Sequence, residues 1–242
     1  MDKEESFADT VKTVIYAILI AVVIRSLCFE PFKIPSGSMY PTLYVGDYLF
    51  VSKYTYGYSK HSFPFSLPLF KGRIWKSDPE RGDVVVFKNP QDNSTDYIKR
   101  VIGLPGDKIK LVKGRLYING KQLERKNEEE FVIRNRFGVA ERYHKYIEVL
   151  PEGKEHFILE ISDNEPYDNF DEVKVPEDKF FMMGDNRDRS DDSRLHVGFV
   201  PSENLVGKAQ FLFFSHNDDD AWYKPWTWPK KIRWSRLFSH IS

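Results

Sequence analysis

Two serines between prolines are the first residues in this sequence whose setting suggests chemistry. The segment 35–41 reads PSGSMYP and places Ser36 and Ser38 on either side of Gly37. Prolines stiffen the flanks and glycine lets the backbone approach closely, so a hydroxyl and nearby N–H groups could be held around an acyl transition state. A serine nucleophile needs a base, yet the sequence has no G-x-S-x-G motif and no triad-like His. The His residues are scattered, which favours structural or solvent-facing roles for them.

A buried lysine can replace His as the base, because burial favours its neutral form. Lys99 is the candidate, in the segment 96–103 (DYIKRVIG), whose composition predicts a strand. Strand alternation places Lys99 with Tyr97 on one face and Arg100 on the other, so one of two adjacent basic residues must face inward. The alternative is that both lie at an exposed edge and oppose aggregation.

A dense charged loop follows a hydrophobic run in residues 180–194, which read FFMMGDNRDRSDDSR. A calcium loop starting at Asp188 would need Gly where Ser193 stands and a bidentate Glu where Phe199 stands. We therefore expect no metal here. Alternating Asp, Arg and Ser can satisfy one another when partly buried, which favours a network that braces a site.

Many short strands are expected to position these residues. Aromatics make up 15% of the chain, with 14 Gly and 14 Pro, which favours strands and turns over a helical bundle. The segment 124–171 is polar and irregular, as an insertion or surface subdomain would be, and Asn119-Gly120 is a strong hairpin signal. The predicted strands are 48–54, 82–87, 96–103, 108–112, 115–118, 179–183 and 206–214.

Length and charge limit the possible classes of protein. The 242 residues suffice for one domain, with or without an inserted subdomain. The 36 Lys and Arg balance the 36 Asp and Glu, so no basic field exists to attract nucleic acid. The single Cys28 excludes an intramolecular disulfide.

The N-terminal segment is apolar enough to enter a membrane. Residues 14–24 are continuously apolar, and 11–29 could cross as one helix if Lys12 and Arg25 extend toward the headgroups. A cleaved signal peptide is the alternative, but the acidic residues before the helix disfavour it. The apolar segment 63–75 and the Trp-, Lys- and Arg-rich tail 222–238 could contact a membrane interface or pack on the domain.

Four motifs in order, SGSMYPT, RGDVVVF, YIKRVIGLPGD and MGDNRDRSDDSR, closely resemble the type I signal peptidase family, the bacterial leader peptidases. The likeness extends through GFVP and ENLVGKA at 198–209, and the single apolar segment resembles the single-anchor members. The resemblance implies a mainly β fold: an antiparallel catalytic domain with a smaller inserted β subdomain, preceded by one transmembrane helix. It also implies a Ser/Lys endopeptidase that removes signal peptides from exported preproteins after small residues.

The resemblance assigns a role to each motif residue. Ser38 would be the nucleophile and Lys99 the general base, with no metal or organic cofactor. Ser36 and the backbone N–H of Ser38 would form the oxyanion hole, and Ser190 would orient Lys99. The supporting ion pairs would be Asp192 with Arg194 and Asp185 with Arg100. The substrate pocket would be lined by Phe32, Ile34, Pro35, Met39, Leu43, Val86, Tyr97 and Ile98.

The resemblance also implies a layout across the bacterial inner membrane. Residues 1–10 would be cytoplasmic, 11–29 the anchor, and 30–242 an extracytoplasmic or periplasmic catalytic domain with its inserted subdomain at about 108–175. The partners would be membrane-tethered preproteins and the lipid bilayer. Ser38 follows residue 29 so closely that even an extended chain keeps it within about 30 Å of the anchor. The rival interpretations are a self-cleaving Ser/Lys regulator and a membrane-tethered β protein without catalysis.

Overall fold

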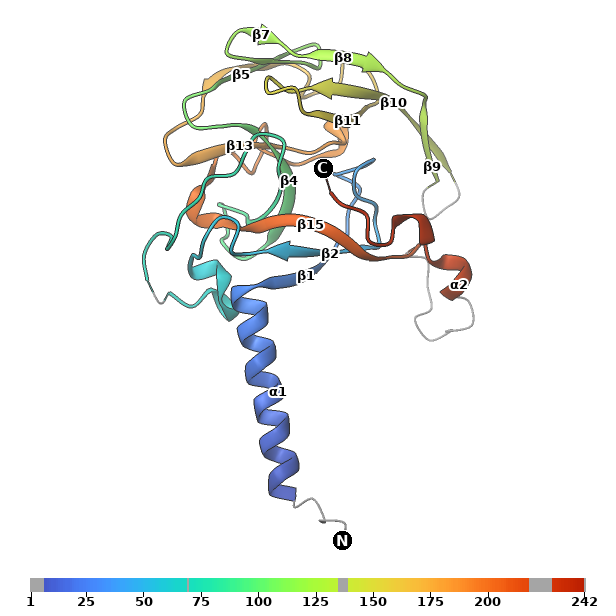
Figure 1. Cartoon of the computed structure of the whole chain (residues 1–242). Coiled ribbons are helices and arrows are strands. Elements are labelled where there is room, and N and C mark those ends of the chain that lie inside the picture. The colour runs from blue at the N-terminus through green and yellow to red at the C-terminus, as the bar shows by residue number, and fades with distance from the viewer. Residues whose placement is uncertain (1–6, 69, 135–138, 218–227, 242) are drawn as a thin grey trace.

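The N-terminal helix stands apart from the β body in this computed structural model, which describes residues 7–68, 70–134, 139–217 and 228–241. Helix α1 (Phe7–Leu27) projects from the body and is the one described helix long and apolar enough to span a membrane (Figure 1). Its 21 residues would extend about 31 Å, the thickness of a bilayer core.

The helix is shifted from the predicted span of 11–29. It begins at Phe7, with Asp9 in its first turn, where an acidic side chain complements the helix dipole. It ends at Leu27 because the chain then becomes β1, in which Phe29 pairs with Ser52 of β2. Phe29 therefore belongs to the β body and not to the helix.

A seven-stranded antiparallel sheet forms the main body, in the order β1-β2-β15-β3-β4-β13-β14. The segment that contains Lys99 forms β4, which lies between β3 and β13 and is therefore an interior strand. The strands of this sheet are β1 (Phe29–Lys33), β2 (Asp47–Ser52), β3 (Val84–Lys88), β4 (Asp96–Gly103), β13 (Lys179–Met183), β14 (Val200–Pro201) and β15 (Leu205–Ser215).

Two smaller sheets lie at the end of the molecule opposite α1 (Figure 1). One has the order β12-β5-β6-β7, and in the other β10 pairs with β11, β8 and β9. Their strands are β5 (Lys108–Val112), β6 (Arg115–Ile118), β7 (Lys121–Gln122), β8 (Glu124–Asn127), β9 (Phe131–Arg134), β10 (Ala140–Val149), β11 (Glu155–Glu160) and β12 (Phe170–Lys174). Asn119 and Gly120 both have positive φ and connect β6 to β7, as the hairpin signal predicted.

The region 124–171 is more regular than its composition indicated. It contains β8 to β11 and the start of β12. Its strands are rich in charged residues, and some of these form ion pairs, such as Arg125 with the buried Glu148 and Glu160. Charged side chains in these pairs hide the alternation that reveals a strand in a sequence.

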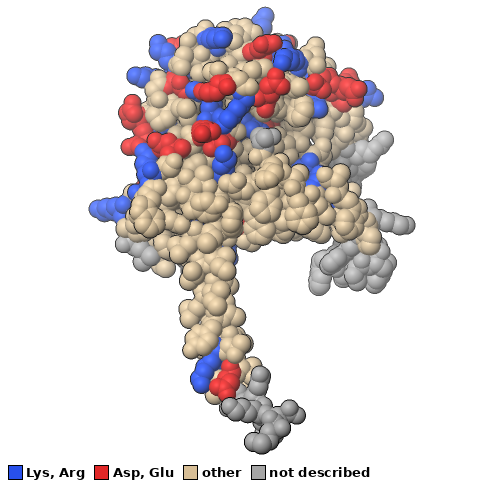
Figure 2. Space-filling model, in the orientation of Figure 1, with Lys and Arg blue, Asp and Glu red and all other residues tan. Residues whose placement is uncertain are grey.

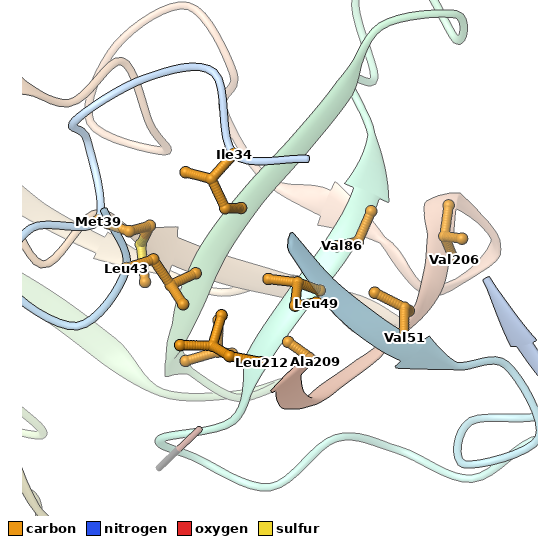
Figure 3. Close-up of a cluster of buried hydrophobic side chains, with 10 residues drawn as sticks. Ile34, Met39, Leu43, Leu49, Val51, Val86, Val206, Ala209 and Leu212 are labelled. Atoms are coloured by element: carbon orange, nitrogen blue, oxygen red, sulfur yellow. The ribbon is translucent and has the colours of Figure 1, made fainter. Parts of the chain in front are cut away.

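A buried apolar cluster fixes the Ser-Gly-Ser segment to the main sheet. Met39 and Leu43 are fully buried and pack with Leu49 and Val51 of β2 and Leu212 of β15 (Figure 3). Burial of a side chain of this size stabilises by roughly 1.5–3 kcal/mol. The loop that carries the serines is therefore held from beneath by its own apolar neighbours.

The C-terminal tail folds back onto the same sheet around Asp47. The fully buried carboxylate accepts hydrogen bonds from the Tyr44 amide at 2.7 Å and the Ser215 hydroxyl at 2.6 Å. Arg236 donates to it at 2.6 Å and Arg233 lies 3.5 Å away. The described part of the tail thus packs on the domain, although Trp234 and Phe238 are exposed; Trp222 and Trp226 lie outside the described residues.

We expect Asp47→Ala to lower the free energy of unfolding by about 3 kcal/mol, because it leaves the two arginines and a buried hydroxyl without their shared acceptor. Urea denaturation in detergent micelles would measure the change. The control is Asp163→Ala, which removes an exposed pair with Arg115 and should cost less than about 1 kcal/mol. Equal effects of the two substitutions would contradict the central role of Asp47.

Candidate active site

Lys99 and Ser38 meet in the interior of the protein although 61 residues separate them in sequence. The Lys99 Nζ donates a hydrogen bond to Ser38 Oγ at 2.6 Å. The exposed fraction is 3% for Lys99 and 8% for Ser38. Lys99 and Arg100 are both buried on an interior strand, so the interpretation of these residues as an exposed edge pair is wrong.

Burial controls the charge of Lys99. Removal from water disfavours the ammonium form and lowers the pKa of Lys99 to about 8, from an ordinary value of 10.5. The carboxylates of Asp192, Asp191 and Asp185 oppose this effect because they favour the cation. A substantial fraction of Lys99 is therefore neutral in mildly alkaline solution and can accept a proton.

Ser36 lies beside the Lys99–Ser38 pair. Its Oγ is 3.4 Å from Ser38 Oγ, and Gly37 between them sits against the ring of Tyr40. A Cβ at Gly37 would lie 2.2 Å from a ring carbon of Tyr40, so only glycine allows this close turn. The three residues place two hydroxyls on one side of the loop.

The charged loop after β13 holds the Ser38 loop through its backbone. The amide N–H of Asn186 donates to the Ser38 carbonyl at 3.1 Å, and the Asn186 side chain donates to the Gly37 carbonyl at 3.1 Å. A Cβ at Gly184 would lie 2.5 Å from the Ser38 carbonyl oxygen. Gly184 and Asn186 were not predicted as site residues, although both lie in the motif MGDNRDRSDDSR.

Ser190 differs from its expected role. The expected hydrogen bond from its hydroxyl to Lys99 is not formed: the hydroxyl is buried and has no hydrogen-bond partner among the described residues. The side chain packs against Gly184, where an added Cβ would lie 2.2 Å from Ser190 Oγ. The close contact with Gly184 is a packing constraint that the sequence does not reveal.

Both expected ion pairs are formed beneath the site. Arg100 binds both carboxylate oxygens of Asp185, at 2.8 and 2.7 Å, and Asp185 also accepts from the Thr42 hydroxyl at 2.6 Å. Arg194 binds both oxygens of Asp192 at 2.9 Å. Asp192 in turn accepts from the Gly184 amide at 3.0 Å, which connects this pair to the Ser38 loop.

A cleft of about 710 Å³ opens beside Ser38 and Lys99. Of the residues expected to line a pocket, Pro35, Tyr97 and Ile98 border this cleft. Ile34, Met39, Leu43 and Val86 lie in the buried cluster behind it, and Phe32 packs against that cluster. Met39 and Leu43 are buried because their loop covers a face of the main sheet, to which Phe32 and Val86 themselves belong.

The far wall of the cleft comes from the region 124–171. Ile133 of β9 and Glu141 and Tyr143 of β10 line the cleft together with Arg189 of the charged loop. Their sequence segment was predicted as an insertion without a known role. A cleft lined by segments that are far apart in the sequence leaves no local pattern in any one of them.

No His lines the cleft within the described chain. His156 and His61 are buried elsewhere, and burial lowers their pKa values to about 3 and about 4. The described residues contain no group of three or more His, Cys, Asp or Glu side chains that could hold a metal ion.

The family model described as signal peptidase, peptidase S26, matches residues 7–214, which include both loops and every residue of the Ser38 cleft. The chain belongs to this family of serine peptidases. It is 45% identical to the signal peptidase I of Rickettsia typhi over 245 aligned residues, which cover 93% of this chain and 90% of that protein. The signal peptidase I of Rickettsia prowazekii is 44% identical over the same shares of both chains.

A solved structure of a signal peptidase I from Enterococcus faecalis is 29% identical and has a TM-score of 0.32. The matched region covers 55% of this chain and 97% of the Enterococcus faecalis chain. Signal peptidases of this kind act on preproteins that bear signal peptides, and the single apolar helix is consistent with a membrane anchor.

We expect Gly184→Ala to abolish most preprotein cleavage by this signal peptidase, because the added Cβ must displace the Ser38 carbonyl. The double variant Gly184→Ala/Ser190→Gly relieves only the contact with the Ser190 side chain, so it should remain impaired. Initial rates on a purified preprotein would show this.

The control for this test is Gly120→Ala, at a position with positive φ and no atom within 4 Å of the added Cβ. It should cost about 1 kcal/mol of stability and leave cleavage intact. Near wild-type cleavage by Gly184→Ala would show that the close contact with Ser38 is not needed.

Proposed function

We propose that this signal peptidase hydrolyses the peptide bond after a signal peptide with Ser38 as nucleophile and Lys99 as general base. The observation that carries the proposal is the buried 2.6 Å hydrogen bond between the Lys99 amine and the Ser38 hydroxyl. A buried amine with a lowered pKa next to a hydroxyl is the arrangement that activates a serine without His.

The proposed reaction uses Lys99 in both directions. Neutral Lys99 accepts the Ser38 proton as Oγ attacks the carbonyl carbon, and the resulting ammonium then protonates the leaving amine of the mature protein. A water molecule next loses a proton to neutral Lys99 and attacks the acyl carbon. The bond between the acyl carbon and Ser38 Oγ then breaks, Ser38 Oγ takes the proton back from the Lys99 ammonium, and the signal peptide leaves as a carboxylic acid that loses its proton to solvent. The Ser38 N–H and the Ser36 hydroxyl would stabilise the oxyanion in each half-reaction.

The surrounding network would position these groups. Asn186 and Gly184 hold the Ser38 carbonyl side of the loop. The pairs Arg100–Asp185 and Arg194–Asp192 satisfy the charges under Lys99. The expected role of Ser190 in orienting Lys99 stays a prediction, because its buried hydroxyl packs against Gly184 and has no hydrogen-bond partner among the described residues.

The cleft supports a preference for small residues, Ala above all, at the first and third positions before the cut. Tyr97, Ile98 and Pro35 border the cleft, and the space behind them is filled by core residues such as Met39. Because core side chains fill the space behind the cleft, the subsites for the substrate side chains next to the reacting bond would be shallow. Residues 108–175 would then act as an inserted subdomain whose β9–β10 hairpin forms the opposite wall.

In the proposed layout, the reaction takes place at the outer surface of the inner membrane. Residues 1–10 would be cytoplasmic, α1 would span the bilayer, and residues 30–242 would be extracytoplasmic. The part of the β body nearest α1 is almost free of charged residues on the side shown in Figure 2. Aromatic rings gather on β1, β2 and β15, where Phe50 packs against Phe29, Phe211 and Phe213. This surface suits contact with lipid and with a preprotein held by its own apolar helix.

Ser38→Ala and Lys99→Arg should each lower preprotein cleavage at least about a thousandfold, since one lacks the nucleophile and the other has a guanidinium that stays protonated. Wild-type kcat/KM should rise about tenfold per pH unit up to the Lys99 pKa of about 8 and then level off. Single-turnover cleavage between pH 6 and pH 10 would test both expectations.

The matched control for Lys99→Arg is Lys110→Arg on the exposed face of β5, which should cleave at the wild-type rate. A preprotein with Phe in place of Ala before the cut should resist cleavage. Retained activity in Lys99→Arg would overturn the dyad.

Lys99→Met should raise stability while removing activity. The folded pKa of Lys99, about 8, lies below 10.5, so at pH 7 the unfolded chain binds the proton more tightly and the folded state loses about 3 kcal/mol. The wild type regains this stability as pH rises from 8 toward 10.5. The advantage of Lys99→Met should therefore be large at pH 7 and small near pH 10.

Urea unfolding at the two pH values would measure this difference, with Lys110→Met as the control for the general effect of the substitution. A Lys99→Met variant that is no more stable than the wild type at pH 7 would argue against a buried amine with a lowered pKa.

A further inference from the structure

A second cavity lies where α1 joins the β body. It has a volume of about 150 Å³ and is bordered by Arg25 and Ser26 at the end of α1 and by Glu30 of β1. The short 3-10 helix Lys60–Ser62 and the neighbouring ends of β3 and β4 complete its wall. The cavity is separate from Ser38, although Asp96 borders both.

Cations outnumber carboxylates around this cavity. Its charged residues are Arg25, Lys53, Lys88, Glu30 and Asp96, which leaves one excess positive charge. The Lys53 ammonium is 3% exposed and bonds Glu30 at 2.8 Å and the Ser62 carbonyl at 2.7 Å. Lys88 lies 2.9 Å from Asp96 and donates to the Ser94 carbonyl at 2.8 Å. Each ammonium has three donor hydrogens, so each retains one beyond these partners.

Two buried polar atoms in the wall have no partner among the described residues. They are the His61 Nε2 and the Ser26 Oγ, in side chains of residues that are each 4% exposed. The other ring nitrogen of His61, Nδ1, lies 2.9 Å from Ser66 Oγ. If the Ser66 hydroxyl donates to Nδ1, the proton of neutral His61 is on Nε2, which then becomes a donor. Buried polar groups without a hydrogen-bond partner are unfavourable, so their presence in a cavity wall points to a ligand that satisfies them.

We propose that this cavity binds the phosphate of one phospholipid headgroup. A phosphate diester carries one negative charge, which matches the one excess positive charge, and its oxygens accept from Lys53, His61 and Ser26. The cavity lies at the last turn of α1, which is the level of the headgroups if α1 spans the bilayer as proposed above. This location favours a lipid phosphate over free phosphate, which carries more charge and needs no membrane.

The test titrates the full-length protein in maltoside micelles, without substrate, and follows the thermal unfolding midpoint. The ligands are dihexanoyl phosphatidylglycerol, dihexanoylglycerol with the same chains but no phosphate, and inorganic phosphate at matched ionic strength. We expect a saturable rise in the midpoint with the phospholipid alone. The variant Ser26→Ala/His61→Leu should bind the phospholipid about tenfold more weakly, because it lacks two donors.

The control variant is His144→Leu on the exposed face of β10, which should bind as the wild type does. Equal shifts with the phosphate-free lipid, or unchanged affinity in the double variant, would overturn the site. Equal affinity for inorganic phosphate would overturn the lipid assignment. Preprotein cleavage measured in the same micelles keeps this result separate from the proposed function, because Ser26 and His61 take no part in the reaction.

Discussion

The burial of one amine beside one hydroxyl is the constraint on which the rest of this structure depends. Lys99 must lose its hydration to be neutral, and the folded state bears that cost. Lys99 lies on β4, an interior strand of the seven-stranded sheet, and its side chain meets the Ser38 loop and the charged loop that carries Asp192. The hydrogen bond of 2.6 Å between the Lys99 Nζ and Ser38 Oγ is therefore formed in the same buried place that lowers the pKa of Lys99.

The loops around this pair are held by contacts that tolerate little change. Gly184 has no side chain, so the Ser190 side chain and the Ser38 carbonyl can both lie close to it. Asn186 donates hydrogen bonds to the carbonyls of Gly37 and Ser38. Arg187 extends this support outward, because its guanidinium bonds the fully buried Glu148 of β10. The small sheet that contains β10 is therefore bonded to the charged loop of the site and also provides part of the cleft lining.

Helix α1 and the Ser38 loop lie close together in the chain. Helix α1 leads directly into β1, β1 pairs with β2, and the serine loop connects those two strands. A lipid-facing surface and a headgroup cavity at this junction would fix the height of Ser38 above the membrane. A preprotein held by its own apolar helix would then present its cleavage site at a matching height.

The sequence alone determined the features that depend on local patterns. Residues 96–103, 108–112, 115–118 and 179–183 were predicted as strands with the observed bounds, because β-branched, aromatic or other apolar residues are concentrated there. The motifs named Ser38, Lys99 and the two ion pairs that lie under them. The apolar helix was also predicted, but its C-terminal end lies at Leu27 because Phe29 pairs with Ser52 of β2, and strand pairing is not a local pattern.

Only the tertiary structure decided which side chains share a space. Met39 and Leu43 were expected at a pocket and lie in the core, since the loop must cover the face of the main sheet. Ile133, Glu141 and Tyr143 were not expected at the cleft and form its wall. Spacing along a chain predicts which face of a strand a residue occupies, but the partner across a gap depends on how separate sheets pack, and that packing has no local signature in the sequence.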